Sequence, residues 1–229
     1  MNDIIEKILN ANHIVIDTDI SNITGASALY TYIIRLHKKV SLVCMEKDDD
    51  KKLSKKYAFL PWFEKVRALK PQSADCFIDF NESCISMYEF FSKNNIKINP
   101  KMATALYAGL LQESEGFSSK IVDGTIFAMA RELIDCGAEY KTCTKYILKT
   151  TSLSFLRLKS KMLSEMLLEN EASASVFTIS SDDLKASGAN IVDCEEVLKE
   201  SLMLQTVEIA VLLDLDNNNE TIKLICKES

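Results

Sequence analysis

Two carboxylates, Asp17 and Asp19, stand between an apolar run and an amphipathic segment in HIVIDTDISNITGASALYTYIIRLHKKV. The run 13–17 has the apolar, β-branched character of a buried strand, and residues 24–38 show helical spacing. Many phosphate-handling and metal-handling sites consist of carboxylates placed between a strand and a helix. The stretch therefore indicates a cation-dependent or phosphate-dependent site, provided that further donors lie nearby.

Two more acidic residues follow regular elements in the same way. Asp79 lies near the end of the strand-like run 75–80 (DCFIDF). Glu113 lies in the last turn of a helix that should begin with Asn99 as its cap and Pro100 at its first helical position. Carboxylate oxygens are the ligands that magnesium and manganese accept.

Each of these residues also has a purely structural interpretation. Asp17 or Asp19 can cap a helix, Asp79 can close a turn at a strand end, and Glu113 can be a solvated side chain. The chain contains two histidines, His13 and His37. They begin a strand and end a helix, which is typical of surface or helix-terminus roles rather than of metal ligation.

The elements that must position these residues alternate between helix and strand at the start of the chain. This order predicts an α/β layer with a mainly parallel sheet flanked by helices over residues 1–150. We expect a helical connector over 151–172 and a small part containing a β-hairpin over 173–229, with the turn at Asn217, Asn218 and Asn219. The connector helix should pack through a face formed by Leu153, Leu156, Leu163 and Leu167.

Composition excludes several classes of protein. The 229 residues are 47% hydrophobic, enough for a sizeable core, and a formal net charge of −6 disfavours binding to long nucleic acid. Apolar runs are too short to cross a bilayer, and the start of the chain is an amphipathic segment, so we expect a cytoplasmic protein without membrane contact. The 7 scattered cysteines indicate reduced thiols, and the mixed-charge run 46–56 a solvated loop or helix start.

Several segments, taken in order, resemble the DHH phosphoesterase family, in the branch of nanoRNases and phosphoadenosine phosphate (pAp) phosphatases. The closest local similarity is INPKMATALYAGLLQESEGF (98–117). It is accompanied by FLPWFEKV, ESCISMYEFF, RELIDCGAEY, VFTISSDDLKASGAN and VEIAVLLDLDNNNETIKLICKES, so it covers nearly the whole chain. The family hydrolyses phosphate esters with two divalent cations, usually manganese, held by His and Asp side chains.

The resemblance implies an eroded set of ligands. Asp17 and Asp19 fall in the first family motif, which lacks its His and one Asp here. Asp79 fits the second motif, the Asp-His-His segment is missing, and Glu113 stands where the family has Asp. The segment 173–229 is similar to a truncated DHH-associated domain without its glycine-rich loop, leaving Lys223 and Lys227 as candidate substrate contacts.

These features imply a degenerate, shortened family member that does not hydrolyse and has no cofactor, with a nucleotide-binding or protein-interaction role. The alternative is a manganese-dependent or magnesium-dependent phosphoesterase acting on pAp or short oligonucleotides. In this alternative Asp17, Asp19, Asp79 and Glu113 would converge at the carboxyl ends of the strands and form an oxygen-only metal site. A third possibility, compatible with the first, is a homodimer anchored by Trp62 and Phe63 in an exposed segment YAFLPWF (57–63). The simpler interpretation of these two aromatic residues is that they cover the edge of the core.

Overall fold

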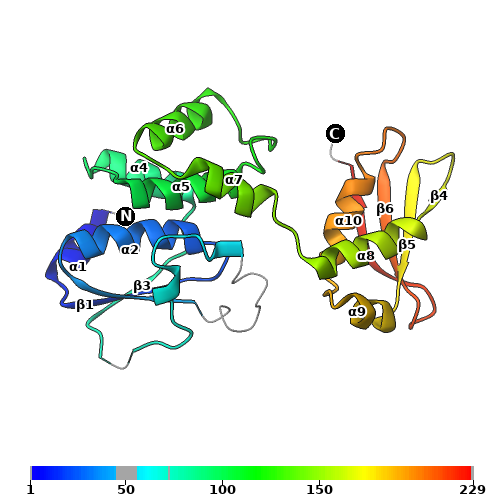
Figure 1. Ribbon diagram of the computed structural model, residues 1–229, viewed down its shortest axis with the longest axis horizontal. Helices are drawn as coiled ribbons and strands as arrows, with labels where there is room; N and C mark the ends of the chain where they lie inside the picture. The colour runs from blue at the N-terminus through cyan, green and yellow to red at the C-terminus, as the bar shows by residue number, and fades with distance from the viewer. Residues whose placement is uncertain (1, 45–55, 72, 228–229) are drawn as a thin grey trace. The chain divides into compact units, whose positions relative to one another are not determined.

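The computed structural model describes residues 2–44, 56–71 and 73–227, so nearly all of the run 46–56 lies outside the described residues. The chain divides into two compact units, Met1–Thr150 and Thr151–Ser229. Figure 1 shows the elements of each unit.

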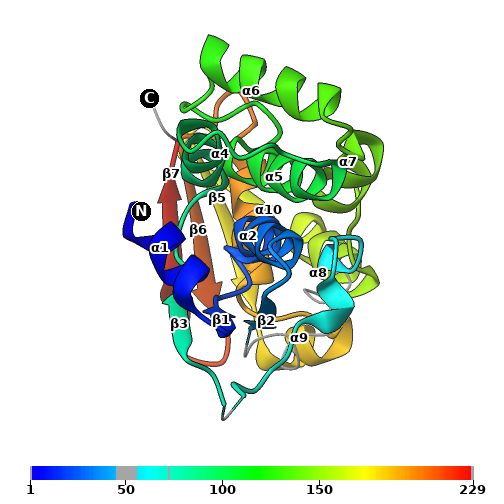
Figure 2. The ribbon, with the colours of Figure 1, turned by 90° about the vertical axis from the view of Figure 1, so that its left-hand side faces the viewer.

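The first unit is a parallel sheet covered by helices. Its strands have the order β2-β1-β3, and both neighbours of β1 run parallel to it. Figures 1 and 2 show α2 over the sheet and α5 over α2. The elements in chain order are α1 (Asn2–Asn10), β1 (His13–Asp17), α2 (Ile23–Arg35), β2 (Lys39–Val43), β3 (Cys76–Asp79), α4 (Cys84–Lys93), α5 (Pro100–Glu113), α6 (Gly124–Asp135) and α7 (Tyr140–Leu148).

Local sequence signals set the ends of the central helices. The side chain of Asn99 accepts the N–H of Met102 at 2.9 Å, with Pro100 in the first turn of α5. Asp123 accepts the N–H groups of Thr125 and Ile126 at the start of α6. These caps satisfy N–H groups that have no partner within the helix, and they confirm the start predicted for α5.

The second unit is a mixed sheet with helices on one face. The strand order is β4-β5-β6-β7, with β5 parallel to β6 and the other neighbours antiparallel. Figure 1 shows α8 and α10 over one face of this sheet. The elements are α8 (Leu153–Ser164), β4 (Leu167–Glu169), β5 (Ala174–Ile179), α9 (Ser181–Ser187), α10 (Asp193–Ser201), β6 (Ile209–Asp214) and β7 (Glu220–Cys226).

The predicted fold class is confirmed: an α/β layer with a parallel sheet precedes a C-terminal part with a β-hairpin. The hairpin joins β6 to β7, and Asn218 and Asn219 have φ angles of 53° and 60°, which asparagine tolerates. Residues 151–172, expected to be a connector, supply α8 and β4 to the second unit.

The prediction for the buried face of α8 is wrong. The helix packs into the core of the second unit through Phe155, Leu158 and Met162. The four leucines expected to face the core are exposed: Leu153, Leu156, Leu163 and, on β4, Leu167. The helix carries two apolar stripes, and the stripe without Phe155 faces away from the sheet.

Candidate functional site

Asp17 and Asp79 lie side by side at the carboxyl edge of the parallel sheet. They are register partners at the ends of β1 and β3, so their side chains project from the same face. The Asp17 side chain is 22% exposed, and Asp79 is exposed. This is the edge at which open α/β sheets bind ligands, and it brings together two of the four predicted carboxylates.

The ammonium of Lys70 forms an ion pair with the carboxylate of Asp17 at this edge. The hydrogen bond to Asp17 and its negative charge raise the pKa of Lys70, and the charge of Asp79 adds to the same shift. A cation belonging to the chain therefore balances the charge of Asp17 and leaves one net negative charge on the two carboxylates. No spacing signal in the sequence pointed to Lys70.

Asp19 serves the turn that leads into α2. Its Oδ1 accepts hydrogen bonds from the Ser21 hydroxyl at 2.7 Å, the Asn22 backbone N–H at 3.2 Å and the Asn22 side-chain amide at 2.9 Å. Such local bonds are characteristic of Asp residues in turns before helices. The structure thus gives Asp19 a structural task next to the predicted site.

Glu113 joins the last turn of α5 to the first turn of α4. Its Oε1 accepts the backbone N–H of Cys84 at 2.5 Å, and the N–H of Ile85 also donates to this carboxylate. Burial raises the pKa of Glu113, although both N–H groups act in the opposite direction. Glu113 therefore supplements the N-cap Ser83 by accepting the first two N–H groups of α4, whose N-terminal dipole favours a negative charge.

Close packing holds the ends of α2, α4 and α5 together around Glu113. The Thr24 hydroxyl contacts the Cys84 sulfur at 3.1 Å. The Gln112 side-chain amide donates to the Ser21 carbonyl at 3.2 Å, and the Tyr57 hydroxyl donates to Gln112 at 2.6 Å. Burial raises the pKa of Tyr57 to about 12, so this hydroxyl stays protonated as a donor at neutral pH.

The two histidines lie away from the Asp17–Asp79 edge. His13 is at the opposite end of β1, and it is buried, so a surface role is wrong for this residue. Its Nε2 lies 3.0 Å from the Ser41 hydroxyl, and its Nδ1 contacts the Ser73 carbonyl. His37 is exposed just after α2, as expected for a residue at a helix terminus.

The described residues do not fit a two-metal centre. Within the ranges 2–44, 56–71 and 73–227, no group of three or more His, Cys, Asp and Glu side chains is arranged to hold a metal ion. Asp17 and Asp79 are register partners, whereas Asp19 and Glu113 bind N–H and hydroxyl donors of their own neighbourhood.

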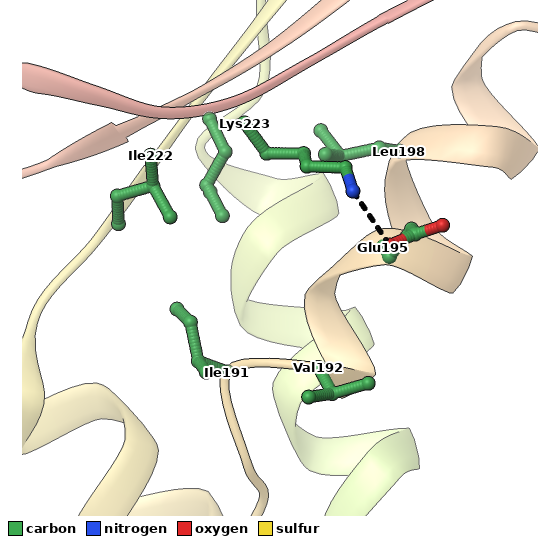
Figure 3. Close-up of a pocket in the computed structure, with 7 residues that line it drawn as sticks. Ile191, Val192, Glu195, Leu198, Ile222 and Lys223 are labelled. Atoms are coloured by element: carbon green, nitrogen blue, oxygen red, sulfur yellow. Dashed lines mark ion pairs between the residues drawn. The ribbon is translucent and has the colours of Figure 1, made fainter.

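The second unit contains the candidate substrate contacts and a pocket. Lys223 Nζ lies 3.1 Å from a carboxylate oxygen of Glu195, and Lys227 Nζ donates to the Leu204 carbonyl at 3.1 Å. Figure 3 shows Lys223 reaching toward Glu195 across a pocket of about 190 Å³. The pocket lies between α10, the residues just before it, and strands β6 and β7. Its lining is Ile191, Val192, Glu195, Leu198, Leu212, Ile222 and Lys223.

The segment YAFLPWF is largely part of the core of the first unit. Tyr57, Leu60 and Phe63 are at most 5% exposed, so Phe63 is not a surface anchor. Trp62 is half-buried, with its ring centroid 6.3 Å from that of Tyr30 and 3.8 Å from the ammonium of Lys101. The simpler interpretation, that these aromatic residues cover the core, therefore agrees with their burial.

Comparisons with known proteins bear on the fold. No family model matches the sequence, and no curated protein matches it. An exopolyphosphatase-related protein from Bacteroides fragilis has a similar structure, with a TM-score of 0.71 and 14% identity over 99% of this chain and 83% of that one. A putative family II inorganic pyrophosphatase from Methanococcus jannaschii is also found, with a TM-score of only 0.34 and 12% identity over 88% of this chain and 82% of that one.

The first of these similarities shows that the chain has an α/β fold like that of the exopolyphosphatase-related protein, and the similarity includes residues of both units. At this identity it establishes the fold alone. Among the described residues, no helix is long and apolar enough to span a membrane.

Proposed function

We propose that this protein is a degenerate member of the DHH family, related to the nanoRNase and pAp phosphatase branch, that binds a nucleotide or a protein and does not hydrolyse phosphate esters. The DHH-like fold and the order of the sequence segments support the family assignment. A cytoplasmic location, expected from the sequence, belongs to the same proposal.

The observation that carries this proposal is the ion pair between Lys70 and Asp17. A divalent cation at the strand ends would need the oxygen lone pairs that now face an ammonium group. It would also lie next to that positive charge, which opposes its binding. Phosphoester hydrolysis by two metals depends on cations that activate water and neutralise the phosphoryl oxygens, so the Lys70–Asp17 pair supports a role without this chemistry.

A second observation favours the alternative function enough to require a test. Asp17 and Asp79 remain adjacent in register, and Asp79 is exposed. If Lys70 swings away, two carboxylates face solvent at the ligand-binding edge of the sheet, where magnesium or manganese can be held. A phosphoesterase acting on pAp or short oligonucleotides would require at least these two ligands.

Hydrolysis assays distinguish the two functions. We expect no release of phosphate from pAp, or of mononucleotide from a dinucleotide, above the buffer control when the protein is incubated with manganese or magnesium. The matched variant is Asp79→Asn, which removes one carboxylate at an exposed position. Hydrolysis by the wild type that is lost in Asp79→Asn would overturn the non-hydrolytic role, because a contaminating enzyme would survive the substitution.

Binding assays identify what the protein recognises. We expect pAp to raise the melting temperature without added metal, and we expect this shift to shrink in the double variant Lys223→Ala/Lys227→Ala, because both cations are candidate phosphate contacts. The control is Lys185→Ala, which removes another exposed lysine of the second unit. Absence of a shift with pAp and with a dinucleotide would contradict the nucleotide role and leave protein interaction as the proposed role.

A further inference from the structure

The pocket of the second unit is lined mainly by aliphatic side chains, and several of them are exposed. Leu198 of α10 and Leu212 of β6 are its buried members. Ile191, Val192 and Ile222 line the same pocket with exposed fractions of 41%, 75% and 40%. Apolar surface that the fold leaves open beside a pocket gains free energy when a ligand covers it. The pocket therefore favours an apolar group.

A β-bulge in β7 directs two neighbouring residues to this pocket. Leu212 of β6 is the register partner of Lys223, and Leu213 is that of Thr221, so Ile222 is an extra residue in β7. Adjacent side chains of a regular strand point to opposite faces, whereas Ile222 and Lys223 both line the pocket (Figure 3). Bulges re-aim side chains in this way beside functional sites. The irregularity places an apolar group and a cation at the same pocket.

Three charged side chains at and beside the pocket carry an excess of positive charge. Carboxylate oxygens of Glu195 lie 3.1 Å from Lys199 Nζ and 3.1 Å from Lys223 Nζ. Hydrogen bonds from Lys199 and from Lys223 lower the pKa of Glu195, so this carboxyl group is ionised at neutral pH. Two ammonium groups thus share one carboxylate. An anion with a single charge matches the positive charge that is left over.

Lys223 can turn to a ligand without leaving Glu195 unpaired. The Lys223 side chain is 48% exposed, and Lys199, one turn further along α10, stays beside the same carboxylate. An exposed ion pair of this kind contributes little to stability. A ligand anion can therefore replace Glu195 as the partner of Lys223 at small cost.

The volume of the pocket sets the size of the apolar group. The pocket measures about 190 Å³. A dry cavity of about 150 Å³ lined by apolar side chains holds a benzene molecule. The pocket therefore has room for an alkyl group of about five or six carbon atoms, and a longer chain would extend into solvent.

We propose that this pocket binds a small aliphatic monocarboxylate. The alkyl tail lies against Ile191, Ile222 and Leu198, and the carboxylate accepts a hydrogen bond from the ammonium of Lys223. Glu195 keeps Lys199 as its partner. The site consists of residues of the second unit alone, and the inference does not depend on the nucleotide or protein role proposed above.

Nuclear magnetic resonance titration of the full chain with isocaproate tests this site. We expect saturable binding of isocaproate, binding weaker by about tenfold or more for acetate, which lacks the alkyl tail, and binding about fivefold weaker for isocaproamide, which lacks the charge. Absence of saturation with isocaproate would overturn the proposal. Equal affinity for isocaproate and isocaproamide would overturn the role of Lys223, and equal affinity for isocaproate and acetate that of the apolar lining.

Substitutions at the ion pair locate the bound carboxylate. Lys223→Met keeps an apolar stem without the charge and should weaken isocaproate binding about fivefold. Glu195→Gln removes the competing carboxylate and should strengthen binding by about twofold or more, an increase that a merely structural ion pair would not produce. The control is Lys185→Met, which removes an exposed lysine paired with Asp182 and should leave the affinity unchanged. Unchanged affinity in Lys223→Met, or weaker binding in Glu195→Gln, would contradict the proposed contact.

Discussion

Glu113 Oε1 accepts the backbone N–H of Cys84 at 2.5 Å and so fastens the end of α5 to the beginning of α4. The N–H of Ile85 donates to the same carboxylate. Glu113, which the resemblance to the DHH family places at a metal-binding position, therefore holds two helices together. The energetic consequences of this contact can be measured separately for the hydrogen-bond acceptor and for the charge.

Removal of the acceptor should destabilise the protein. We expect Glu113→Ala to lower the free energy of unfolding by about 1–2 kcal/mol, because the N–H groups of Cys84 and Ile85 lose their acceptor. Glu113→Gln keeps an oxygen acceptor and carries no charge in a site whose burial raises the pKa of the acid, so it should be at least as stable as the wild type at neutral pH. Urea denaturation of the wild type, Glu113→Ala and Glu113→Gln measures these differences. Equal losses of unfolding free energy in the two variants would contradict the role of Glu113 as a hydrogen-bond acceptor.

The charge of Glu113 should appear in the pH dependence of stability. Its ordinary pKa is 4.5, and burial raises the pKa in the folded protein. The folded state therefore binds this proton more tightly than the unfolded state, and its contribution to the free energy of unfolding falls as pH rises from 4.5 through the raised pKa. The difference in urea midpoint between the wild type and Glu113→Gln should change across this window. A difference in urea midpoint that stays constant with pH would contradict a raised pKa of Glu113.

Close packing of α5 predicts a sensitive glycine. A Cβ at Gly109 would lie 1.9 Å from the Cys84 sulfur and 2.6 Å from the Thr24 hydroxyl oxygen. We expect Gly109→Ala to cost about 1–3 kcal/mol of unfolding free energy, because the helices must separate. The control is Gly124→Ala at the start of α6, where a Cβ meets nothing within 4 Å and stability should change by less than about 0.5 kcal/mol. Thermal or urea unfolding would measure both, and similar values would contradict the packing.

Asp75 should contribute to acid stability. Its carboxylate accepts the backbone N–H groups of His13 at 2.8 Å and Asn12 at 2.9 Å, which lowers its pKa from 3.8 to about 2. The folded state therefore binds a proton at Asp75 less tightly than the unfolded state. The stabilising contribution of Asp75 is present above pH 3.8 and is lost as the pH falls toward about 2. Acid titration by circular dichroism should show a steeper loss of stability below 3.8 in the wild type than in Asp75→Asn. Parallel curves would show that these bonds do not favour the charged form.

The ion pair at the sheet edge predicts a gain of metal binding on mutation. We expect Lys70→Met to bind manganese more tightly than the wild type, because the charge facing Asp17 and Asp79 is removed. Electron paramagnetic resonance of free manganese would measure the change. Lys70→Met/Asp17→Asn should lose the gain, and Lys93→Met, which removes a solvent-exposed lysine paired with Glu89, should show none. Tight binding by the wild type would contradict occupation of the edge by Lys70.

The sequence was most informative where the determining contacts are local. The cap at Asn99 and the turn at Asn218 and Asn219 depend on neighbouring residues, and both were predicted correctly. The buried face of α8 was predicted wrongly. Both stripes of this helix are apolar, and only packing against the sheet, which is distant in sequence, decides which stripe is buried. Phe155 on one stripe is in the core, whereas Leu156 on the other is exposed.

The candidate site was partly predictable for the same reason. Asp17 and Asp79 end two apolar strands, and parallel pairing brings such ends together. Lys70 reaches them through a tertiary contact: the chain after β2 returns, and Arg67 pairs its backbone with Leu42 and Cys44 at 2.9 Å. Nothing in the local sequence around Lys70 encodes that return, so its partner Asp17 could not be inferred.

The Lys70–Asp17 pair has a consequence for how the protein responds to its surroundings. A bound metal ion exchanges with the medium, so its occupancy follows the concentration of that metal and falls when a chelator is added. An ammonium group attached to the chain keeps a fixed effective concentration beside its carboxylate. The positive charge beside Asp17 therefore comes with the folded chain and is not drawn from the supply of divalent ions.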